Sequence, residues 1–465
     1  QGEFKGSFDG DGHTISGLYI NRPTTDNVGF FFRLRDNGTV KNLTISGEII
    51  GQNNVGGISG NNYYGSILNC NFNGTVTGVA AVGGINGRSY PASILNTCVF
   101  TGTINGASEV GGIVGSYQVY YGSGNVINCQ ANGTINATGS YIGGILGHAW
   151  LGGKTLQDMS VTNLTFNCSA TSDNVGGFAG QIYEGRLVNI TVEANISGRN
   201  NIGGLVGYGY PFYGTEDCTF EGNVTGTAYV GGMCGYIEGH WSTYETLDCI
   251  VRGIITGTTS VGVIAGYSRD THFKNFTINS ADVTLVTTST SDYVGGIAGS
   301  GYDVLFTNCH TNLDVSGRDY VGGICGRHYP AKGMTMCSSL GNISGRNYVG
   351  GLCGQYHIWN YSTSTTKLTL SYAGGTVTSA TGERIGGLVG DLIGTIENSY
   401  AFGSVSGVLC VGGLVGNAYD GYLVTSYSRG AVAGTTSVGG LLGRNEGGSS
   451  ATNSYWDTET SGQAT

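Results

Sequence analysis

Proline, charged residues and long apolar runs are scarce in this sequence. Four of its 465 residues are proline, and 11% are Asp, Glu, Lys or Arg. A collagen-like rod needs abundant proline and glycine at every third position, so the proline count excludes it. No run of eighteen apolar residues occurs, and Gln1-Gly2-Glu3-Phe4 does not resemble a signal peptide. We therefore expect a mature or trimmed segment with no membrane insertion.

Net charge and glycine content narrow the class further. The chain has 20 Lys and Arg against 30 Asp and Glu, so its net charge of −10 disfavours a nucleic-acid partner. Its 39% of hydrophobic residues is too high for a disordered chain, whereas 87 glycines exceed the content of ordinary globular domains. A regular, turn-rich, all-β protein remains.

One phrase, Val-Gly-Gly-(Ile or Leu)-x-Gly, recurs along the whole chain. We call the first glycine of each pair the anchor. Most anchors are 26 to 28 or 31 to 33 residues apart, and four successive spacings from Gly56 sum to 120 and then 119. The anchors are Gly56, Gly83, Gly111, Gly143, Gly176, Gly203, Gly231, Gly262, Gly295, Gly322, Gly350, Gly386, Gly412 and Gly439.

This repeat predicts an all-β fold, a single β-solenoid (β-helix) of about 15 coils with a base period near 27 residues and a four-coil super-period near 120. Short runs of alternating β-formers bounded by Gly and Asn are typical of strands, and stacking the coils buries a face that no coil buries alone. A propeller blade needs four strands, for which the period is too short. We expect an entry strand and N-terminal coil at 1–28, the solenoid at 29–452, and a closing segment at 453–465.

The paired glycines have a predicted steric purpose. Tight corners need positive φ, and bare Cα atoms permit close backbone approach, so we expect both at the pairs. Apolar residues around the pairs are expected to point inward; they are Val55, Ile58, Val82, Ile85, Val110 and Ile113.

These repeats resemble the GLUG-motif family of bacterial surface and adhesin-like proteins, named for its Gly-Leu-x-Gly core. The segments 387–390 and 413–416 read Gly-Leu-Val-Gly, and 453–463 resembles the phrase that closes such arrays. The segment 8–18 is similar to the strand that opens many bacterial β-helical surface domains. The resemblance implies a secreted or surface-displayed solenoid used in adhesion or scaffolding, and it supplies no catalytic residues.

Twelve cysteines follow the repeat rather than the spacing of a metal site. Six lie thirteen residues before an anchor and three lie three residues after one, and every coil with the second kind also has the first. This coupling predicts cross-core disulfides and an oxidising compartment. The alternative is a ladder of buried thiols, since Cys70 and Cys98 have no second cysteine in their coils. The candidate disulfides pair Cys218 with Cys234, Cys309 with Cys325, and Cys337 with Cys353.

Asn-x-Ser/Thr sequons are frequent, which predicts N-glycosylation if the source is eukaryotic and solvent-facing amides if it is bacterial. Three of them, at 195, 223 and 342, take the same place in their coils. The thirteen candidates are Asn37, Asn42, Asn73, Asn132, Asn136, Asn163, Asn167, Asn189, Asn195, Asn223, Asn275, Asn342 and Asn360.

Ten aromatic residues follow an anchor by six or seven residues, namely Tyr63, Tyr90, Tyr117, Trp150, Tyr183, Tyr210, Tyr302, Tyr329, Tyr356 and Tyr419. Two interpretations stay open: a row that binds sugar rings, and a ladder that packs only against itself and seals a corner. Two further tryptophans, next to His240 and near His357, lie in longer coils, as lateral contacts or as local loop packing. The candidate glycan or partner contacts are Trp150, Tyr210, Trp241, Tyr329 and Trp359.

An enzyme is the alternative function, because many right-handed β-helices cleave polysaccharides. Glycoside hydrolysis needs two carboxyl groups roughly 5 to 10 Å apart, but the acids here are scattered, and the best local group is Glu238, His240 and Glu245. Asp9-Gly10-Asp11-Gly12 lacks the further ligands of a calcium loop, and no Cys-x-x-Cys occurs. We expect no catalytic, metal-binding or cofactor-binding residues.

The sequence thus favours a non-enzymatic structural or adhesive solenoid outside the cell or at its surface. Its role would be that of a spacer, an adhesin segment or a filament subunit. The expected partners are further copies of the chain, end to end or laterally, and carbohydrate. The alternative is a polysaccharide lyase or hydrolase on the same fold.

Overall fold

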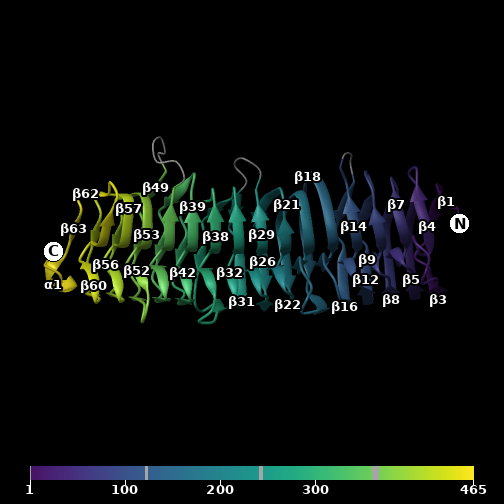
Figure 1. Ribbon diagram of the computed structural model, residues 1–465. Helices are drawn as coiled ribbons and strands as arrows, with labels where there is room; N and C mark the ends of the chain where they lie inside the picture. The colour runs from purple at the N-terminus through teal and green to yellow at the C-terminus, as the bar shows by residue number, and fades with distance from the viewer. Residues whose placement is uncertain (1, 121–123, 240–244, 359–365, 465) are drawn as a thin grey trace. The chain divides into compact units, whose positions relative to one another are not determined.

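The structure, a computed structural model, describes residues 2–120, 124–239, 245–358 and 366–464. The chain forms two compact units: Gln1–Gly226 with Gly232–Ile237, and Thr227–Gly231 with Glu238–Thr465. Each unit consists of stacked coils of short parallel strands (Figure 1). The chain makes about 16 turns with a period near 28 residues, which confirms the predicted β-solenoid. Over the described ranges, α1 (Thr458–Ser461) is the one α-helix.

The coils of the first unit have three to five strands, and the coil that starts at Asn53 has three. It begins with β6 (Asn53–Gly56), turns at the glycine pair into β7 (Ser59–Tyr63), and continues into β8 (Ser66–Thr77). Each strand pairs in parallel with its counterpart one coil later, so Val55 lies opposite Val82. Equivalent residues of successive coils therefore form columns that run along the unit.

The coils of the second unit have four or five strands. The coil that starts at β42 (Asp319–Gly322) continues through β43 (Cys325–Tyr329), β44 (Gly333–Thr335), β45 (Ser338–Ser339) and β46 (Ile343–Ser344). Where the coil at β6 has the single long strand β8, this coil has the three short strands β44, β45 and β46, separated by additional corners. In these two coils the anchor strand and the strand after it have the same lengths, four and five residues.

The anchors end one strand in every coil. In the first unit these strands are β6, β9 (Ala80–Gly83), β13 (Ser108–Gly111), β17 (Ile142–Gly143), β20 (Val175–Gly176) and β23 (Asn200–Gly203). In the second unit they are β28 (Ala228–Gly231), β32 (Thr259–Gly262), β37 (Asp292–Gly295), β42, β47 (Asn347–Gly350), β52 (Glu383–Gly386), β56 (Leu409–Gly412) and β60 (Thr436–Gly439).

The paired glycines are needed because backbone and core press directly on them, as predicted. A Cβ atom on Gly56 would lie 2.4 Å from the carbonyl oxygen of Ser59, and one on Gly57 would lie 2.3 Å from Cγ of Phe72. The amide of Gly57 donates to the carbonyl oxygen of Gly84 in the next coil, at 3.2 Å. The first glycine thus gives room to backbone and the second gives room to a core ring.

The prediction of positive φ at the pairs is wrong. Among the described residues, no anchor glycine has positive φ; the residue two before the anchor has it instead, with 54° at Asn54, 52° at Ala81 and 51° at Glu109. The corner is therefore made one step earlier. A left-handed conformation costs a non-glycine residue only a modest strain, which the packed coil imposes, whereas contact of the backbone with the next coil leaves no room for any side chain.

The core is apolar and follows the predicted pattern. All six side chains predicted to point inward are fully buried, namely Val55, Ile58, Val82, Ile85, Val110 and Ile113. Phe72 and Phe100 stack in adjacent coils with ring centroids 6.4 Å apart. Burial of such columns provides the main favourable free energy of folding.

Substituting an anchor glycine is expected to destabilise the first unit. In Gly111→Ala the new Cβ would lie 2.0 Å from the carbonyl oxygen of Val114 and 2.7 Å from the amide of Gly147. Since both contacts are backbone, we expect a loss of about 2 to 4 kcal/mol, measured as a lower thermal unfolding temperature by circular dichroism. Gly2→Ala is the control, because no atom lies within 4 Å of its new Cβ; equal melting of the two variants would contradict the packing argument.

The core of the second unit contains a titratable side chain, His328, which is fully buried. Its Nε2 lies 3.0 Å from the carbonyl oxygen of Val304, and the rings of Phe306 and Tyr356 lie 5.1 and 5.4 Å from its own. Burial lowers the pKa of His328 to about 4, against a weaker raising effect of that hydrogen bond. The neutral imidazole is therefore the form that fits the folded core.

The stability of the folded chain is expected to decrease as the pH falls, because of this histidine. The unfolded chain binds a proton at His328 near pH 6.5 and the folded one only near pH 4, so the contribution is complete above pH 6.5 and is lost as pH falls toward 4. The loss amounts to about 3 kcal/mol. We expect urea midpoints of the wild type to drop more steeply than those of His328→Leu across this range. Parallel pH profiles for the two proteins would contradict it.

Candidate functional site

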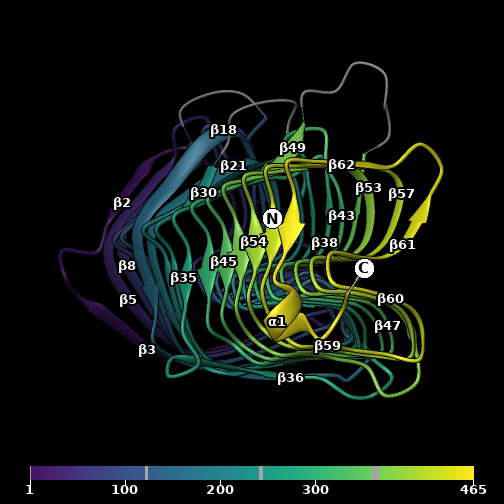
Figure 2. The same ribbon diagram turned by 90° about the vertical axis from the view of Figure 1, so that its left-hand side faces the viewer.

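Side chains of two strands meet along the corner that follows each glycine pair. The residue two before an anchor makes contact there with a residue five after an anchor. We call the residues at these two positions, together with the residues seven after an anchor, the corner surface. In the first unit Arg88 Nη2 donates to Glu109 Oε2 at 2.9 Å. Asn61 Nδ2 donates in the same way to Oδ1 of Asn27, which lies two residues before Gly29, at 3.1 Å. In the second unit, β43 and β53 (Val389–Glu397) lie on one side of this corner and β47 and β60 on the other (Figure 2).

Two predicted contact residues join one aromatic row on this surface in the first unit. Trp150, on β18 (Leu146–Val161), is in register with Tyr183, and their rings stack 5.4 Å apart. Tyr210 continues the row at 6.3 Å from Tyr183 and is 41% exposed. Trp150 Nε1 donates to Glu184 Oε2 at 3.0 Å, which fixes the indole.

The third described contact residue, Tyr329, lies in an aromatic group of the second unit. Its ring is 4.9 Å from that of Tyr302. The Arg327 guanidinium lies 5.3 Å from the Tyr329 ring and 4.4 Å from the ring of Tyr293, and it donates to Tyr302 at 3.0 Å. Cation–π contacts with several rings hold this arginine in place. Trp241 and Trp359 lie outside the described residues.

The predicted row of ten aromatic residues does not lie on one face. Tyr117 and Tyr356 follow their anchors by six residues, and both side chains are fully buried. The other members follow by seven. One residue of difference turns a strand side chain to the opposite face, so these two tyrosines belong to the core.

Sequence reasoning missed a charged cluster around Asp391, which is 2% exposed. Its Oδ2 lies 2.7 Å from His357 Nε2 and 3.2 Å from Arg384 Nη1, and its Oδ1 accepts from Asn417 Nδ2 at 2.9 Å. Burial raises the pKa of Asp391, but these hydrogen bonds and positive charges outweigh it and lower the pKa overall. Asp391 lies five residues after its anchor, so comparing that position between coils is the signal that identifies the cluster.

A second missed feature is a tyrosine ladder on another face of the second unit. Tyr372, Tyr400, Tyr427 and Tyr455 pair in register on β50 (Tyr372–Ala373), β54 (Tyr400–Ala401), β58 (Tyr427–Ser428) and β63 (Tyr455–Trp456). The first three rings stack at 5.1 and 4.9 Å. Figure 2 shows β45 and β54 on this face, and β50 pairs with both. Because the rings cover one another, the ladder matches the self-packing interpretation; its signal is the repeated Ser-Tyr pair.

The twelve cysteines all lie in the described ranges, and each carries a thiol, so the predicted disulfides are not present. Cys309 Sγ donates to the carbonyl oxygen of Thr307 at 3.4 Å, Cys337 Sγ to that of Thr335 at 3.3 Å, and Cys325 Sγ to that of Arg327 at 3.2 Å. Cysteines instead follow columns, and Cys325 is in register with Cys353. Burial raises the pKa of Cys325 to about 12. None of the three predicted disulfides is therefore formed: Cys218 with Cys234, Cys309 with Cys325, or Cys337 with Cys353.

Twelve of the thirteen sequon asparagines are described, and none of these is buried; Asn360 lies outside the described residues. Asn42, Asn132 and Asn136 are half-buried and the other nine are exposed. Asn195 Oδ1 accepts from the amide of Asn223 at 2.9 Å. Asn42, Asn136, Asn167 and Asn189 instead donate from coil to coil through Nδ2, the atom that glycosylation would modify. The location fits both interpretations of the sequons.

In the best local group for an enzyme, both glutamates lie next to basic side chains. Glu238 Oε1 lies 3.3 Å from Arg269 Nη1, and Glu245 Oε1 lies 3.1 Å from His272 Nδ1 and 3.3 Å from Lys274 Nζ. His240 lies outside the described residues. Within the part of the chain that the structure describes, no group of three His, Cys, Asp or Glu side chains is placed to hold a metal ion.

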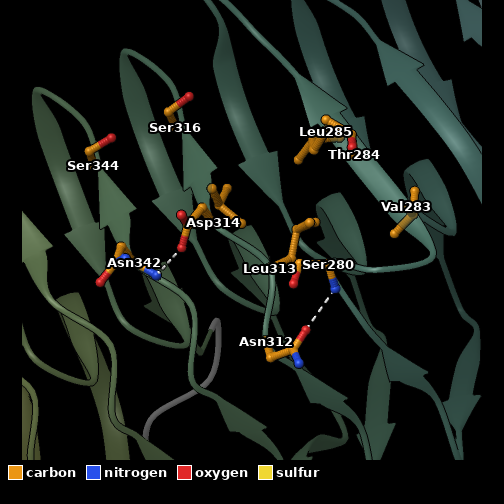
Figure 3. Close-up of a pocket in the computed structure, with 11 residues that line it drawn as sticks. Ser280, Val283, Thr284, Leu285, Asn312, Leu313, Asp314, Ser316, Asn342 and Ser344 are labelled. Carbon is orange, nitrogen blue, oxygen red and sulfur yellow. Dashed lines mark hydrogen bonds between the residues drawn. The ribbon is translucent and has the colours of Figure 1, made fainter.

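An open pocket of about 430 Å³ in the second unit is lined mainly by hydroxyl, amide and carboxylate groups (Figure 3). Asn312 Oδ1 accepts from the amide of Ser280 at 2.8 Å, and Asp314 Oδ1 accepts from the amide of Asn342 at 2.7 Å. Leu285, on β36 (Val283–Val286), adds apolar surface. Polar groups that converge beside an apolar wall are suited to a polyhydroxylated ligand.

Comparison with known proteins supports the resemblance read from the repeats. The GLUG motif model matches residues 51–77. Halomucin of Haloquadratum walsbyi is 47% identical over 58 residues, which are 12% of this chain and 1% of halomucin. A Gly-rich membrane protein of Evansella cellulosilytica is 38% identical over 64 residues, 13% of this chain and 7% of that protein. The chain therefore spans a small part of the curated relatives that it matches, and no solved structure matches it.

The described ranges contain no helix of the length and apolar character that a bilayer crossing requires.

Thiol chemistry is expected to separate the two interpretations of the cysteines. Alkylation of the native protein without reductant should label none of the buried thiols, because burial makes them inaccessible and, at Cys70, also raises the pKa to about 11. After denaturation without reductant, mass spectrometry should find all twelve alkylated. Peptides cross-linked between Cys337 and Cys353 would restore the disulfide prediction.

Proposed function

We propose that this chain is an extracellular or surface-displayed structural solenoid that adheres to carbohydrate and has no enzymatic activity. The observation that carries the proposal is the aromatic row of Trp150, Tyr183 and Tyr210, in which Trp150 is in register with Tyr183 and Tyr210 is 41% exposed. Aromatic rings with a polar rim pack well against sugar rings. The hydroxyl-lined pocket of the second unit supports the same ligand class.

The surface location is supported by the comparisons and by the sequons. The GLUG motif match and the similarity to halomucin point to proteins displayed on cells. Every described sequon asparagine reaches the solvent. Stacked coils hold such groups at fixed spacing within each unit, which suits a spacer or an adhesin segment and also allows end-to-end or lateral assembly of copies.

Retention on polysaccharide is expected to depend on the aromatic row. Trp150→Ala and Tyr210→Ala should each reduce retention in affinity electrophoresis through polysaccharide gels at least threefold, because each removes a ring from the row. Tyr455→Ala, which removes a tyrosine of the second unit that is 67% exposed, is the matched control and should migrate as the wild type does. Equal loss in all three variants would contradict a specific contact.

The same samples address the remaining parts of the proposal. Electron microscopy of native protein should show rods or fibres, and intact mass before and after deglycosylation reports on the sequons. Incubation with polysaccharides should leave their chain length unchanged. New reducing ends or unsaturated products would favour the lyase or hydrolase instead.

A further inference from the structure

We propose that a pocket in the first unit, formed by Arg33, Arg35, Asn61, Tyr63 and Tyr90, binds the ring of an acidic sugar of the hexuronate class. The choice of carbohydrate rests on the proposed function. The pocket itself rests on observations that do not involve the aromatic row at Trp150. It has a volume of about 250 Å³, below the range usual for drug-sized ligands, and so accommodates a single ring.

The pocket is built by register. Arg33 and Arg35 lie on β4 (Phe31–Arg35), and they pair with Asn61 and Tyr63 on β7 of the next coil. The ring of Tyr90, one coil further, lies 5.4 Å from that of Tyr63 at an angle of 52°. Three successive coils thus place two guanidinium groups and one amide beside two tilted aromatic rings.

Several polar atoms of the pocket are buried without a partner. Asn61 is 5% exposed; its Nδ2 donates to Asn27 Oδ1, but its Oδ1 accepts no hydrogen bond. The Nε atoms of Arg33 and Arg35 also have none. Buried polar atoms normally have partners, because an unsatisfied one costs free energy. A ligand that fits would therefore accept hydrogen bonds from both arginines and donate one to Asn61.

The charge at the pocket favours an anion. Glu3, on β1 (Glu3–Phe4), accepts through one oxygen from Arg33 Nη1 at 3.2 Å and from Arg35 Nη1 at 2.9 Å. One carboxylate thus faces two guanidinium groups, which retain further donors. Planar guanidinium groups bind carboxylates through paired hydrogen bonds, so a second carboxylate is the matching group.

The tyrosine rings select a sugar from among carboxylates. The guanidinium of Arg35 lies 4.8 Å from the centroid of the Tyr63 ring, which orients both side chains. The C–H face of a pyranose packs against such rings, and its hydroxyl groups supply the donor that Asn61 Oδ1 lacks. A hexuronate combines the carboxylate, the hydroxyl groups and the apolar face in one ring.

Calorimetric titration of the full chain tests this assignment, with D-glucuronate, D-glucose and acetate as probes. We expect saturable binding of glucuronate that weakens from 20 to 500 mM NaCl, and at least tenfold weaker binding of glucose and of acetate. Arg35→Gln should reduce glucuronate affinity at least tenfold, and Arg35→Lys should reduce it less. Arg199→Gln, which removes the same charge from an ion pair with Asp173 in the same unit, should leave it unchanged.

Glu3→Gln gives the opposite sign. Removing the Glu3 carboxylate frees hydrogen-bond donors of both arginines and removes a negative charge that repels glucuronate. We therefore expect the affinity for glucuronate to rise at least threefold. This result would not arise from general damage to the fold, which lowers affinity. Circular dichroism of each variant checks that the coils remain intact.

Three results would overturn the inference: no saturable binding of glucuronate, equal binding by wild type and Arg35→Gln, or tighter binding of an acetyl-Glu-Glu peptide than of glucuronate. The last would make the pocket a site for acidic peptide. If glucuronate fails while polysaccharide retention still depends on Trp150 and Tyr210, the pocket assignment alone is wrong. If both fail, the proposed carbohydrate function is wrong as well.

Discussion

The close approach of successive coils at the glycine pairs is the constraint on which the rest of each unit depends. The bare Cα atoms let the amide of one pair donate to the carbonyl of the next, as from Gly57 to Gly84, and let a core ring such as Phe72 pack against the second glycine. Any side chain there would separate two backbones. Once that contact is fixed, the register of both flanking strands is fixed, and every other position falls into a column.

The repeat therefore made the architecture predictable. Buried positions such as Val55 and Ile58 follow from the period, because a solenoid gives equivalent residues equivalent surroundings. Local geometry was less predictable. The left-handed corner lies at residues as different as Asn54, Ala81 and Glu109, so no residue type marks it. Cysteines do occur at both positions of the same coils in the sequence, but stacking along a column accounts for Cys325 and Cys353 without a disulfide across the core.

The candidate site was only partly accessible from sequence for a related reason. An offset of six or seven residues from the anchor decides whether a tyrosine enters the core, as Tyr117 does, or reaches the surface, as Tyr210 does. Contacts across the corner surface join residues of different strands and often of different coils. Arg33, Asn61 and Asp391 carry no motif, and their importance becomes visible only when one position is compared from coil to coil.

The hydrogen bonds between coils give each unit a direction-dependent response to load. They point along the direction of stacking, and we call the set of hydrogen bonds between two neighbouring coils a seam. A force applied along the stacking direction opens one seam at a time, because each seam bears the full force. A pull along the strands instead loads all the hydrogen bonds of a seam together, and many bonds that share a load resist it better than bonds broken in sequence. A unit that is attached through its side faces is loaded along its strands and would resist a large force. The same force applied to an end coil would separate the coils one after another.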